Sequence, residues 1–329
     1  MSSYKPLLSD FETQRAISLV KDKFTAELCT ALNLSRVTAP LFVKTSSGLN
    51  DNLNGVERPV SFDILETGEM AEVVHSLAKW KRMALHNYGF PMHTGLYTDM
   101  NAIRRDEECD NIHSIYVDQW DWEKIITAED RNLDYLKETV RNIFSALKNT
   151  EKAVCEAYPC IEESLPDEIA FVTTQELEDR YPDLTAKQRE YEAAKEYGAV
   201  FLMQIGGRLK SGKKHDGRAP DYDDWTLNGD ILLYNKVLDI AFEISSMGIR
   251  VDRVSLMNQL KAENAEDRME FNFHKMLSVG ALPLTIGGGI GQSRLCMYLL
   301  KKAHIGEVQV SIWPEKEIAK AKKSGINLL

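Results

Sequence analysis

The sequence lacks long apolar stretches and an excess of positive charge. No run of eighteen apolar residues occurs, and the opening segment has no basic region followed by an apolar one, as a secretory signal would. The 40 lysine and arginine residues are outnumbered by 50 aspartate and glutamate residues, which gives a net charge of -10. This balance disfavours a large nucleic-acid partner, because no overall cationic field would attract phosphates. We therefore expect a cytoplasmic protein with neither a membrane nor a nucleic acid as its partner.

Cysteine motifs and the common nucleotide-binding motifs are also missing. The cysteines are odd in number and form no CxxC or Cys/His cluster, so neither a disulfide framework nor a structural zinc site is expected. The absence of GxxxxGK[ST] excludes a P-loop. A glycine-rich segment does occur at 287–291, but a Rossmann fold would need it after the first strand. The five cysteines are Cys29, Cys109, Cys155, Cys160 and Cys296.

The composition is that of a folded globular protein. Of the 329 residues, 43% are hydrophobic and 27% are charged, close to the average for globular chains. We find no internal repeat, low-complexity tract or Pro/Ser linker. The simplest partition is therefore a single mixed domain that spans residues 1–329.

Hydrophobic periodicity predicts an alternation of helices and strands. Ser9 and Glu12 have the spacing of a capping box, so the first helix is expected from Ser9 to about Asn33. Pro40 suits an edge or interface position in the strand that follows. Further helices are predicted over residues 76–86, 129–158, 185–198, 253–277 and 292–300, with one more ending before Pro182. Strands are predicted over residues 36–43, 72–75, 113–123, 199–203, 231–235 and 241–251, a polar loop around 218–224 and a turn at 287–291.

Two arginines stand in segments suited to phosphate binding. Arg104 follows a strand end, opposite a strand that carries Gln119 and Asp121, and could clamp a phosphate beside a polar substrate. Arg294 follows the glycine-rich segment in the first turn of a helix, where backbone can approach a ligand closely. Taken alone, the first segment is more often an ordinary charged hairpin, and the second can be a tight turn into a core helix.

In this order, the proline-bearing strand, the arginine hairpin and the terminal glycine–arginine helix resemble the three motifs of class II aminoacyl-tRNA synthetases. The resemblance implies an α+β fold in which a mixed, mainly antiparallel β-sheet is flanked by helices, and a homodimer formed through the opening helix and the Pro40 strand. It also implies that Arg104, with Glu107 nearby, grips the α-phosphate of ATP and that Arg294 lies against the distal phosphates. Residues 230–235 and 242–250 look like the catalytic strands of the aspartyl/asparaginyl branch, so Glu243, helped by Asp230, would hold Mg²⁺.

Three further segments narrow the resemblance. They are EVVHSLAKWKR at 72–82, YVDQWDWE at 116–123 and RAPDYDDW at 218–225, which resemble the ammonia-dependent aspartate ligase family of the asparagine synthetase A type. The likeness covers nearly the whole chain and implies neither a separate anticodon-binding domain nor a glutaminase domain. The link from Trp225 to Asp230 is shorter than in the family, so the loop that borders the pocket could close differently.

The family chemistry begins when the β-carboxylate of aspartate attacks the α-phosphate of ATP and forms β-aspartyl-adenylate and pyrophosphate. Ammonia then displaces AMP. By this resemblance, Asp51 accepts the proton that ammonium must lose. Without the family resemblance, we would interpret Lys81 as an exposed lysine, Asp51 as a loop-capping residue and RAPDYDDW as a polar turn. The implied catalytic residues are Asp51, Arg104, Gln119 and Arg294, and the implied aspartate-binding residues are Lys81, Gln119, Asp121, Asp223 and Ser246.

Two other functions compete with this interpretation. An aspartyl/asparaginyl-type aminoacyl-tRNA ligase would use the same core, but the missing anticodon module and the acidic balance weigh against it. A noncatalytic paralogue is disfavoured because Arg104, Glu243 and Arg294 are all present. Glutamine as the nitrogen donor is also disfavoured, although a partner could supply ammonia.

Overall fold

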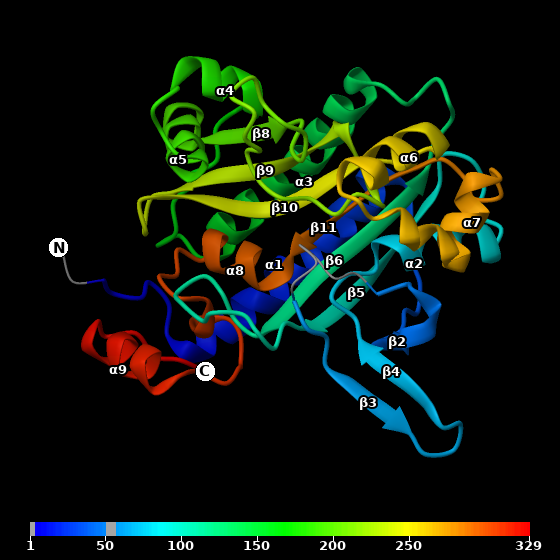
Figure 1. Ribbon diagram of the computed structural model, residues 1–329. Helices are drawn as coiled ribbons and strands as arrows, with labels where there is room; N and C mark the ends of the chain where they lie inside the picture. The colour runs from blue at the N-terminus through cyan, green and yellow to red at the C-terminus, as the bar shows by residue number, and fades with distance from the viewer. Residues whose placement is uncertain (1–3, 51–56) are drawn as a thin grey trace.

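The computed structural model describes residues 4–50 and 57–329 of the chain (Figure 1). Asp51, the predicted proton acceptor, lies outside the described residues. Within the described ranges, no helix is both long and apolar enough to cross a membrane.

A large sheet forms the centre of the molecule. Its pairings are antiparallel except at the two ends, where β1 runs parallel to β5 and β7 parallel to β8. The prediction of a mixed, mainly antiparallel sheet is therefore confirmed. In spatial order its eight described strands are β1 (Leu34–Arg36), β5 (Gly95–Ile103), β6 (Tyr116–Ile125), β11 (Thr285–Gly291), β10 (Ile240–Arg250), β9 (Asp223–Asn235), β8 (Ala199–Met203) and β7 (Ala170–Thr173).

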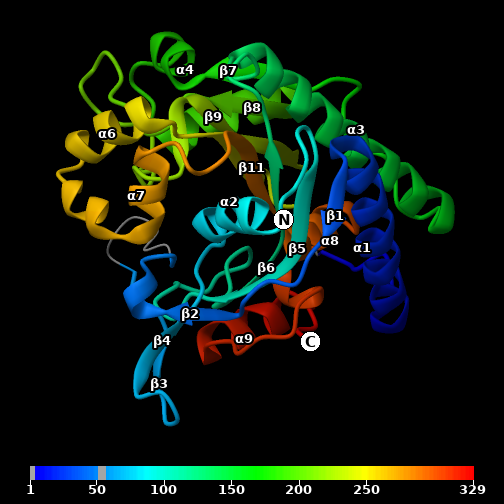
Figure 2. The same ribbon diagram turned by 90° about the vertical axis from the view of Figure 1, so that its right-hand side faces the viewer.

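A smaller sheet projects from the body of the molecule. Its three described strands are ordered β2 (Phe42–Lys44), β4 (Glu69–Val73) and β3 (Ser61–Ile64), all antiparallel. Figures 1 and 2 both show the β3–β4 hairpin extending away from the large sheet.

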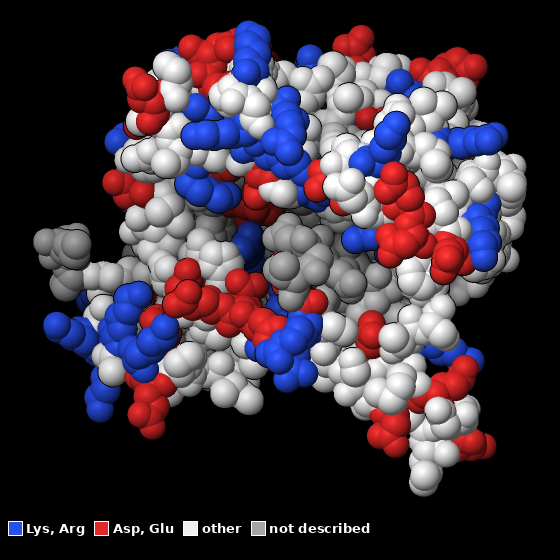
Figure 3. Space-filling view, in the orientation of Figure 1, with Lys and Arg blue, Asp and Glu red and all other residues white. Residues whose placement is uncertain are grey.

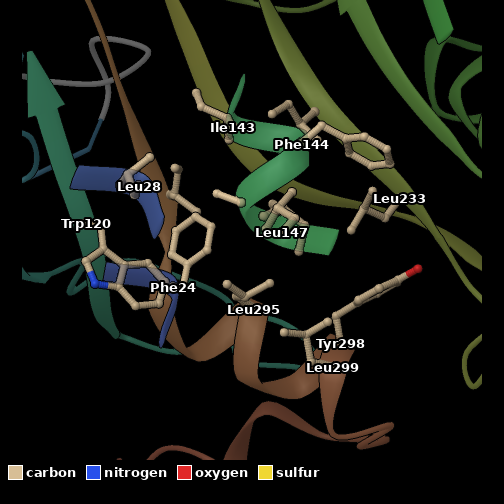
Figure 4. Packing of buried hydrophobic residues seen from close by; sticks show 14 of the residues in the cluster. Phe24, Leu28, Trp120, Ile143, Phe144, Leu147, Leu233, Leu295, Tyr298 and Leu299 are labelled. Atoms are coloured by element: carbon tan, nitrogen blue, oxygen red, sulfur yellow. The ribbon is translucent and has the colours of Figure 1, made fainter. Parts of the chain in front are cut away.

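The main hydrophobic core lies on one face of the large sheet. There α1 (Asp10–Leu32), α3 (Leu133–Ala157) and α8 (Gln292–Leu299) pack together over the strands (Figure 4). The rings of Phe24 and Trp120 lie 4.7 Å apart at their centroids and join α1 to β6. The predicted first helix is confirmed, because Ser9 and Glu12 form a capping box and Asn33 ends the helix in the left-handed conformation at φ 59°.

The other face of the sheet is covered by α2 (Ala78–Asn87) and α5 (Ala186–Tyr197). Figure 2 shows α2 and α1 on opposite sides of β5 and β6. Strand alternation explains the division on β8, since Phe201 belongs to the main core while Val200 and Leu202 pack in a separate cluster with Ala193 of α5. The remaining helices are α4 (Thr174–Arg180), α6 (Arg253–Ala262), α7 (Asn272–Ser278) and α9 (Glu315–Lys323), with 3-10 turns at Thr45–Ser47, Glu266–Glu270 and Ile305–Glu307.

Two predicted elements are interrupted in the structure. The strand expected over 36–43 is two short strands, because β1 ends at Arg36 and β2 begins at Phe42. Pro40 lies in the connection, consistent with its lack of a backbone N–H for a sheet ladder. The helix expected over 253–277 is broken between α6 and α7, where Asn264 adopts a left-handed conformation at φ 53°.

Two predicted turns or loops are strands. The glycine-rich segment forms β11, which lies between β10 and β6. A Cβ atom at Gly288 would lie 2.5 Å from the Cβ of Met247, so glycine lets the two strands approach closely. The polar loop around 218–224 ends inside β9, which begins at Asp223. The short link from Trp225 to Asp230 is consequently part of one continuous strand.

Candidate active site

A cleft opens on the α2 face of the sheet. It has two adjoining parts that share a wall of six residues. The space-filling view shows a hollow with acidic and basic side chains close together at its margin (Figure 3). The shared residues are His75, Arg104, Glu107, Tyr222, Glu243 and Ser246.

Strand alternation separates the β6 side chains at 119–121 between the cleft and the core. Gln119 and Asp121 line it, whereas Trp120 between them packs into the core. The glycines of β11 lie opposite, and a Cβ atom at Gly289 would collide with the amide of Gln119. The glycine-rich strand therefore leaves room for the polar side chains of its neighbour.

The cleft brings together most of the residues that the sequence singled out. Asp230 is one exception, since it is not among the residues that line the cleft, although it bonds to Arg218, which lines the adjoining part. Asp51 cannot be placed because it lies outside the described residues. The predicted residues that line the cleft are Lys81, Arg104, Glu107, Gln119, Asp121, Asp223, Glu243, Ser246 and Arg294.

Lys81 is buried at the inner end of the cleft. Only 1% of its side chain is exposed, so its interpretation as an exposed lysine is wrong. Its Nζ donates to the carboxylate of Asp121, to the carbonyl of Trp122 at 2.9 Å and to the carbonyl of Gly288 at 3.1 Å. Burial lowers the pKa of Lys81, while the negative charge of Asp121 opposes this shift.

Arg250 is a cleft residue that sequence reasoning missed. Its Nη2 lies 2.7 Å from Glu123, and its Nη1 lies 2.5 Å from Asp223. Glu123 also accepts a 2.6 Å hydrogen bond from Thr285 of β11. One arginine thus holds β6 and β9 side chains in place from β10. Charged residues at the ends of otherwise apolar strands were the available sequence signal.

The two predicted phosphate-binding arginines both line the cleft, and Arg104 also lines the adjoining outer part. Arg104 follows β5, and its Nε is buried without a hydrogen-bond partner among the described residues. Its Nη1 lies 3.9 Å from Glu107, too far for a hydrogen bond. Arg294 Nη1 donates to the backbone carbonyl of Glu243 at 3.1 Å, and its guanidinium lies 5.9 Å from the ring centroid of Phe242. Both guanidinium groups retain donors for a ligand.

Arg218 and Asp230 form a second ion pair that sequence reasoning missed. Arg218 also bonds to Asp216 at 3.1 Å. Burial, and then the charge of Glu243, raise the pKa of Asp230 to about 7 against the opposing effect of Arg218. The other oxygen of this carboxylate, Oδ1, is buried and has no hydrogen-bond partner in the described part of the chain.

Asp230 and Glu243 are compatible with a magnesium ion. No cluster of three or more His, Cys, Asp or Glu residues that could hold a metal exists within residues 4–50 and 57–329. Magnesium, however, is often held by one or two carboxylates, with phosphates and water as the remaining ligands. One oxygen of Asp230 has no hydrogen-bond partner among the described residues, and the negative charge of Glu243 acts on the same carboxylate. Both observations fit such a site.

Comparisons with known proteins identify the family. The family model for aspartate–ammonia ligase matches residues 11–325. The chain belongs to the aspartate–ammonia ligase family. It is 63% identical over 327 residues to an aspartate–ammonia ligase of Clostridium perfringens, covering 99% of this chain and 97% of that protein. It is 64% identical to the enzyme of the same name from Clostridium tetani, covering 99% of this chain and 96% of the relative.

Solved structures establish the fold of this ligase family member. Asparaginyl-tRNA synthetase from Pyrococcus horikoshii, complexed with asparaginyl-adenylate, matches with a TM-score of 0.66 and 15% identity over 92% of this chain and 70% of that chain. Aspartyl-tRNA synthetase from Entamoeba histolytica matches with a TM-score of 0.58 and 16% identity over 90% of this chain and 57% of that chain. The predicted class II synthetase-like fold and the ligase family are both confirmed, and the aminoacyl-tRNA ligase alternative is not favoured.

Proposed function

We propose that this enzyme uses ATP to join L-aspartate and ammonia into L-asparagine through a β-aspartyl-adenylate, with release of AMP and pyrophosphate. The observation that carries the proposal is the shape of the cleft in a member of this family. Its buried inner end holds Lys81 and Asp121, and Arg104 and Arg294 line the same cavity at less buried positions. A small charged amino acid and a nucleotide would thus meet in one cavity.

Activation of aspartate would depend on cationic groups. The β-carboxylate of aspartate and the α-phosphate of ATP are both anions, so positive charge must hold them together and stabilise the charge that moves onto phosphoryl oxygens. Arg104 would bind the α-phosphate and Arg294 the distal phosphates, with Glu107 beside them. Magnesium held by Asp230 and Glu243 would neutralise phosphate oxygens when bound.

Selection of aspartate would take place at the buried inner end. A carboxylate of the substrate would replace one of the three acceptors that Lys81 holds, and Asp121 and Asp223 would attract its α-ammonium group. Gln119 and Ser246 line the same cavity and offer neutral hydrogen-bonding groups. Fixed groups of both signs suit a zwitterion with an additional carboxylate, because each charge of the ligand can meet an opposite charge.

Ammonia would enter the reaction after the adenylate forms, and Asp51 would accept its excess proton. The chain before Asp51 is tied to the cleft wall, which supports this role. Asn50 accepts a 2.9 Å hydrogen bond from the backbone of His75, and His75 lines the cleft.

We also propose that this single catalytic domain works in the cytoplasm as a homodimer. The proposed interface comprises α1 and the segment that contains Pro40. Large apolar side chains are exposed there, with Phe11 73%, Leu41 52% and Phe42 46% accessible. Light scattering should give twice the mass of one chain, and a monomeric mass at working concentration would contradict this assembly.

The identity of the molecule that accepts the activated aspartyl group provides the decisive test of the reaction. Purified protein would be incubated with ATP, Mg²⁺ and labelled aspartate, together with either ammonium or tRNA. We expect labelled asparagine and an equal amount of AMP with ammonium alone. Labelled tRNA would instead show an aminoacyl-tRNA ligase, and the absence of AMP under both conditions would show that the chain does not activate aspartate.

A further inference from the structure

An exposed arginine contacts the turn that carries Arg104. Arg58 lies just before β3, and Asp106 lies in the turn between β5 and β6. Asp106 accepts hydrogen bonds from the Nε of Arg58 at 2.9 Å, from its Nη2 at 2.5 Å and from its backbone N–H at 3.2 Å. The two residues lie far apart in the sequence, and together they line the outer part of the cleft.

Among the described residues, the part of the turn at 104–107 has few other anchors, whereas the chain after it is held by the 3.4 Å bond from Lys316 to Glu108 and by the burial of Cys109 in the main core. The backbone of Arg104 is held at one point by the carbonyl of Ile115 at 2.8 Å, and the turn closes when Glu107 N–H donates to the carbonyl of Arg104 at 3.0 Å. The residues of the turn are largely exposed, and within the described part of the chain the guanidinium of Arg104 has a single ion-pair contact, the 3.9 Å approach to Glu107. The position of Arg104 therefore depends on the backbone of this turn, which the three bonds from Arg58 fasten to the segment before β3.

The same contact also changes the charge of the phosphate end. An unpaired carboxylate at Asp106 would repel a triphosphate in the outer part of the cleft. Hydrogen bonds from Arg58 lower the pKa of Asp106 to about 2, because they stabilise its charged form. Because the positive charge of Arg58 compensates that of Asp106, less negative charge competes with a phosphate for Arg105 and Arg218 in the same wall.

We propose that Arg58 is a positioning residue for nucleotide binding, which acts through Asp106 to hold the Arg104 turn in place. This inference rests on the proposed use of ATP. It assigns Arg58 no contact with the substrate, and it predicts that loss of the pair weakens ATP binding while aspartate recognition at the buried end is unaffected.

Binding of ATP to the intact protein would be measured by calorimetry without aspartate, and the KM for aspartate would be measured at saturating ATP. Arg58→Ala should raise the Kd for ATP about threefold to tenfold, since an exposed pair contributes modestly but sets the geometry of a phosphate ligand. Asp106→Ala should raise the Kd in the same direction but by less, because it also removes a negative charge that would repel the triphosphate. The double variant should be no weaker than either single variant. Exchange of the two charges, Arg58→Asp with Asp106→Arg, should restore most of the affinity, and the KM for aspartate should not change.

A matched control is available on α4. Arg180 pairs with Glu196 at 2.8 Å with 42% and 46% of the two side chains exposed, and neither residue lines the cleft. Arg180→Ala should leave the Kd for ATP unchanged. An equal loss in this control would overturn the proposal, because it would reflect a general loss of positive charge.

Three other results are distinguishable. An unchanged Kd in Arg58→Ala would overturn the proposal. A loss in Arg58→Ala that Asp106→Ala does not share and the exchanged pair does not repair would also overturn it, because Arg58 would then act on the nucleotide directly. Failure of the wild-type protein to bind ATP would instead refute the proposed function on which the inference rests.

Discussion

The two ends of the cleft are built in different ways. At the inner end, Lys81, Glu123 and Arg250 are at most 3% exposed, and each has charged or carbonyl partners from another element. At the outer end, the side chain of Arg104 is 28% exposed and that of Arg58 is 68% exposed. Because desolvated charges interact more strongly than exposed ones, the inner end is preorganised for a small ligand. The outer end has a geometry that depends on a turn and on the nucleotide itself.

The largest expected effect comes from breaking the inner network. Arg250→Met would leave Glu123 and Asp223 buried without their cation, so the free energy of unfolding should fall by about 3–5 kcal/mol. Urea denaturation followed by circular dichroism would measure this change. Arg180→Met on the surface is the control and should cost less than about 1 kcal/mol. Equal stability of Arg250→Met and the wild type would show that the inner end is not held by these ion pairs.

A substitution at the outer end should lower the enzymatic activity and leave the free energy of unfolding nearly unchanged. Arg104→Lys keeps the charge but removes the planar fork that can bind a phosphate with two bonds. Aspartate-dependent exchange of pyrophosphate into ATP should fall about 100-fold, in the range found when one preorganised donor is lost. The unfolding free energy should change by less than about 0.5 kcal/mol, as is usual for substitutions outside a packed core. Unchanged exchange kinetics would remove Arg104 from the phosphate site.

Asp221, a buried residue next to the cleft residue Tyr222, offers a test of how the buried ion pairs depend on pH. Its buried carboxylate lies 3.0 Å from His274, 2.9 Å from Arg268 and 3.4 Å from Lys79 of α2. Burial alone would raise the pKa of Asp221, but these cationic partners and the bond to His274 hold it well below the ordinary value of 3.8.

Because the folded pKa is depressed, the stabilisation from Asp221 is complete above the unfolded value and is lost as the pH falls through the folded value. Asp221→Asn should therefore be about 2 kcal/mol less stable than the wild type at pH 7, the usual range for lost bonds between charged groups. The difference should shrink as the pH falls below 4. Denaturation curves across pH 3–7 would measure it, and a constant difference would show that the charge of Asp221 is not the cause.

The smallest expected effect concerns Glu107. Its carboxylate lies 3.9 Å from Arg104, and both side chains are 28% exposed, so their attraction is weak. Glu107→Gln should change the KM for ATP by about twofold to threefold. A change above about tenfold would show that Glu107 itself contributes strongly to the nucleotide site, and the outer end would then be less adaptable than we infer.

The sequence predicted well what depends on local patterns and ordered motifs. The capping box at Ser9 and the apolar strand at 199–203 follow from periodicity alone. Arg104 and Arg294, distant in sequence, line one cleft as the resemblance implied.

The remainder depends on packing between distant segments. A run of glycines is typical of a turn, and residues 287–291 form a strand because they pair with β10 on one side and β6 on the other. The partners of Arg250 and Arg218 could not be predicted for the same reason, since Glu123 and Asp230 come from other strands. Lys81 was placed in the site by resemblance, whereas its own sequence context favours solvent.

The glycine-rich strand β11 also limits how this ligase could be redesigned. A Cβ atom on Gly287 would collide with Glu123, one on Gly288 with Met247, and one on Gly289 with Gln119. Glycine has no side chain that could be shortened, so substitutions at these positions cannot enlarge the cavity. A variant that accepts a longer acidic amino acid would have to gain its space from the opposite wall, where trimming residues of α2 would disturb Lys81, the lysine proposed to bind the substrate.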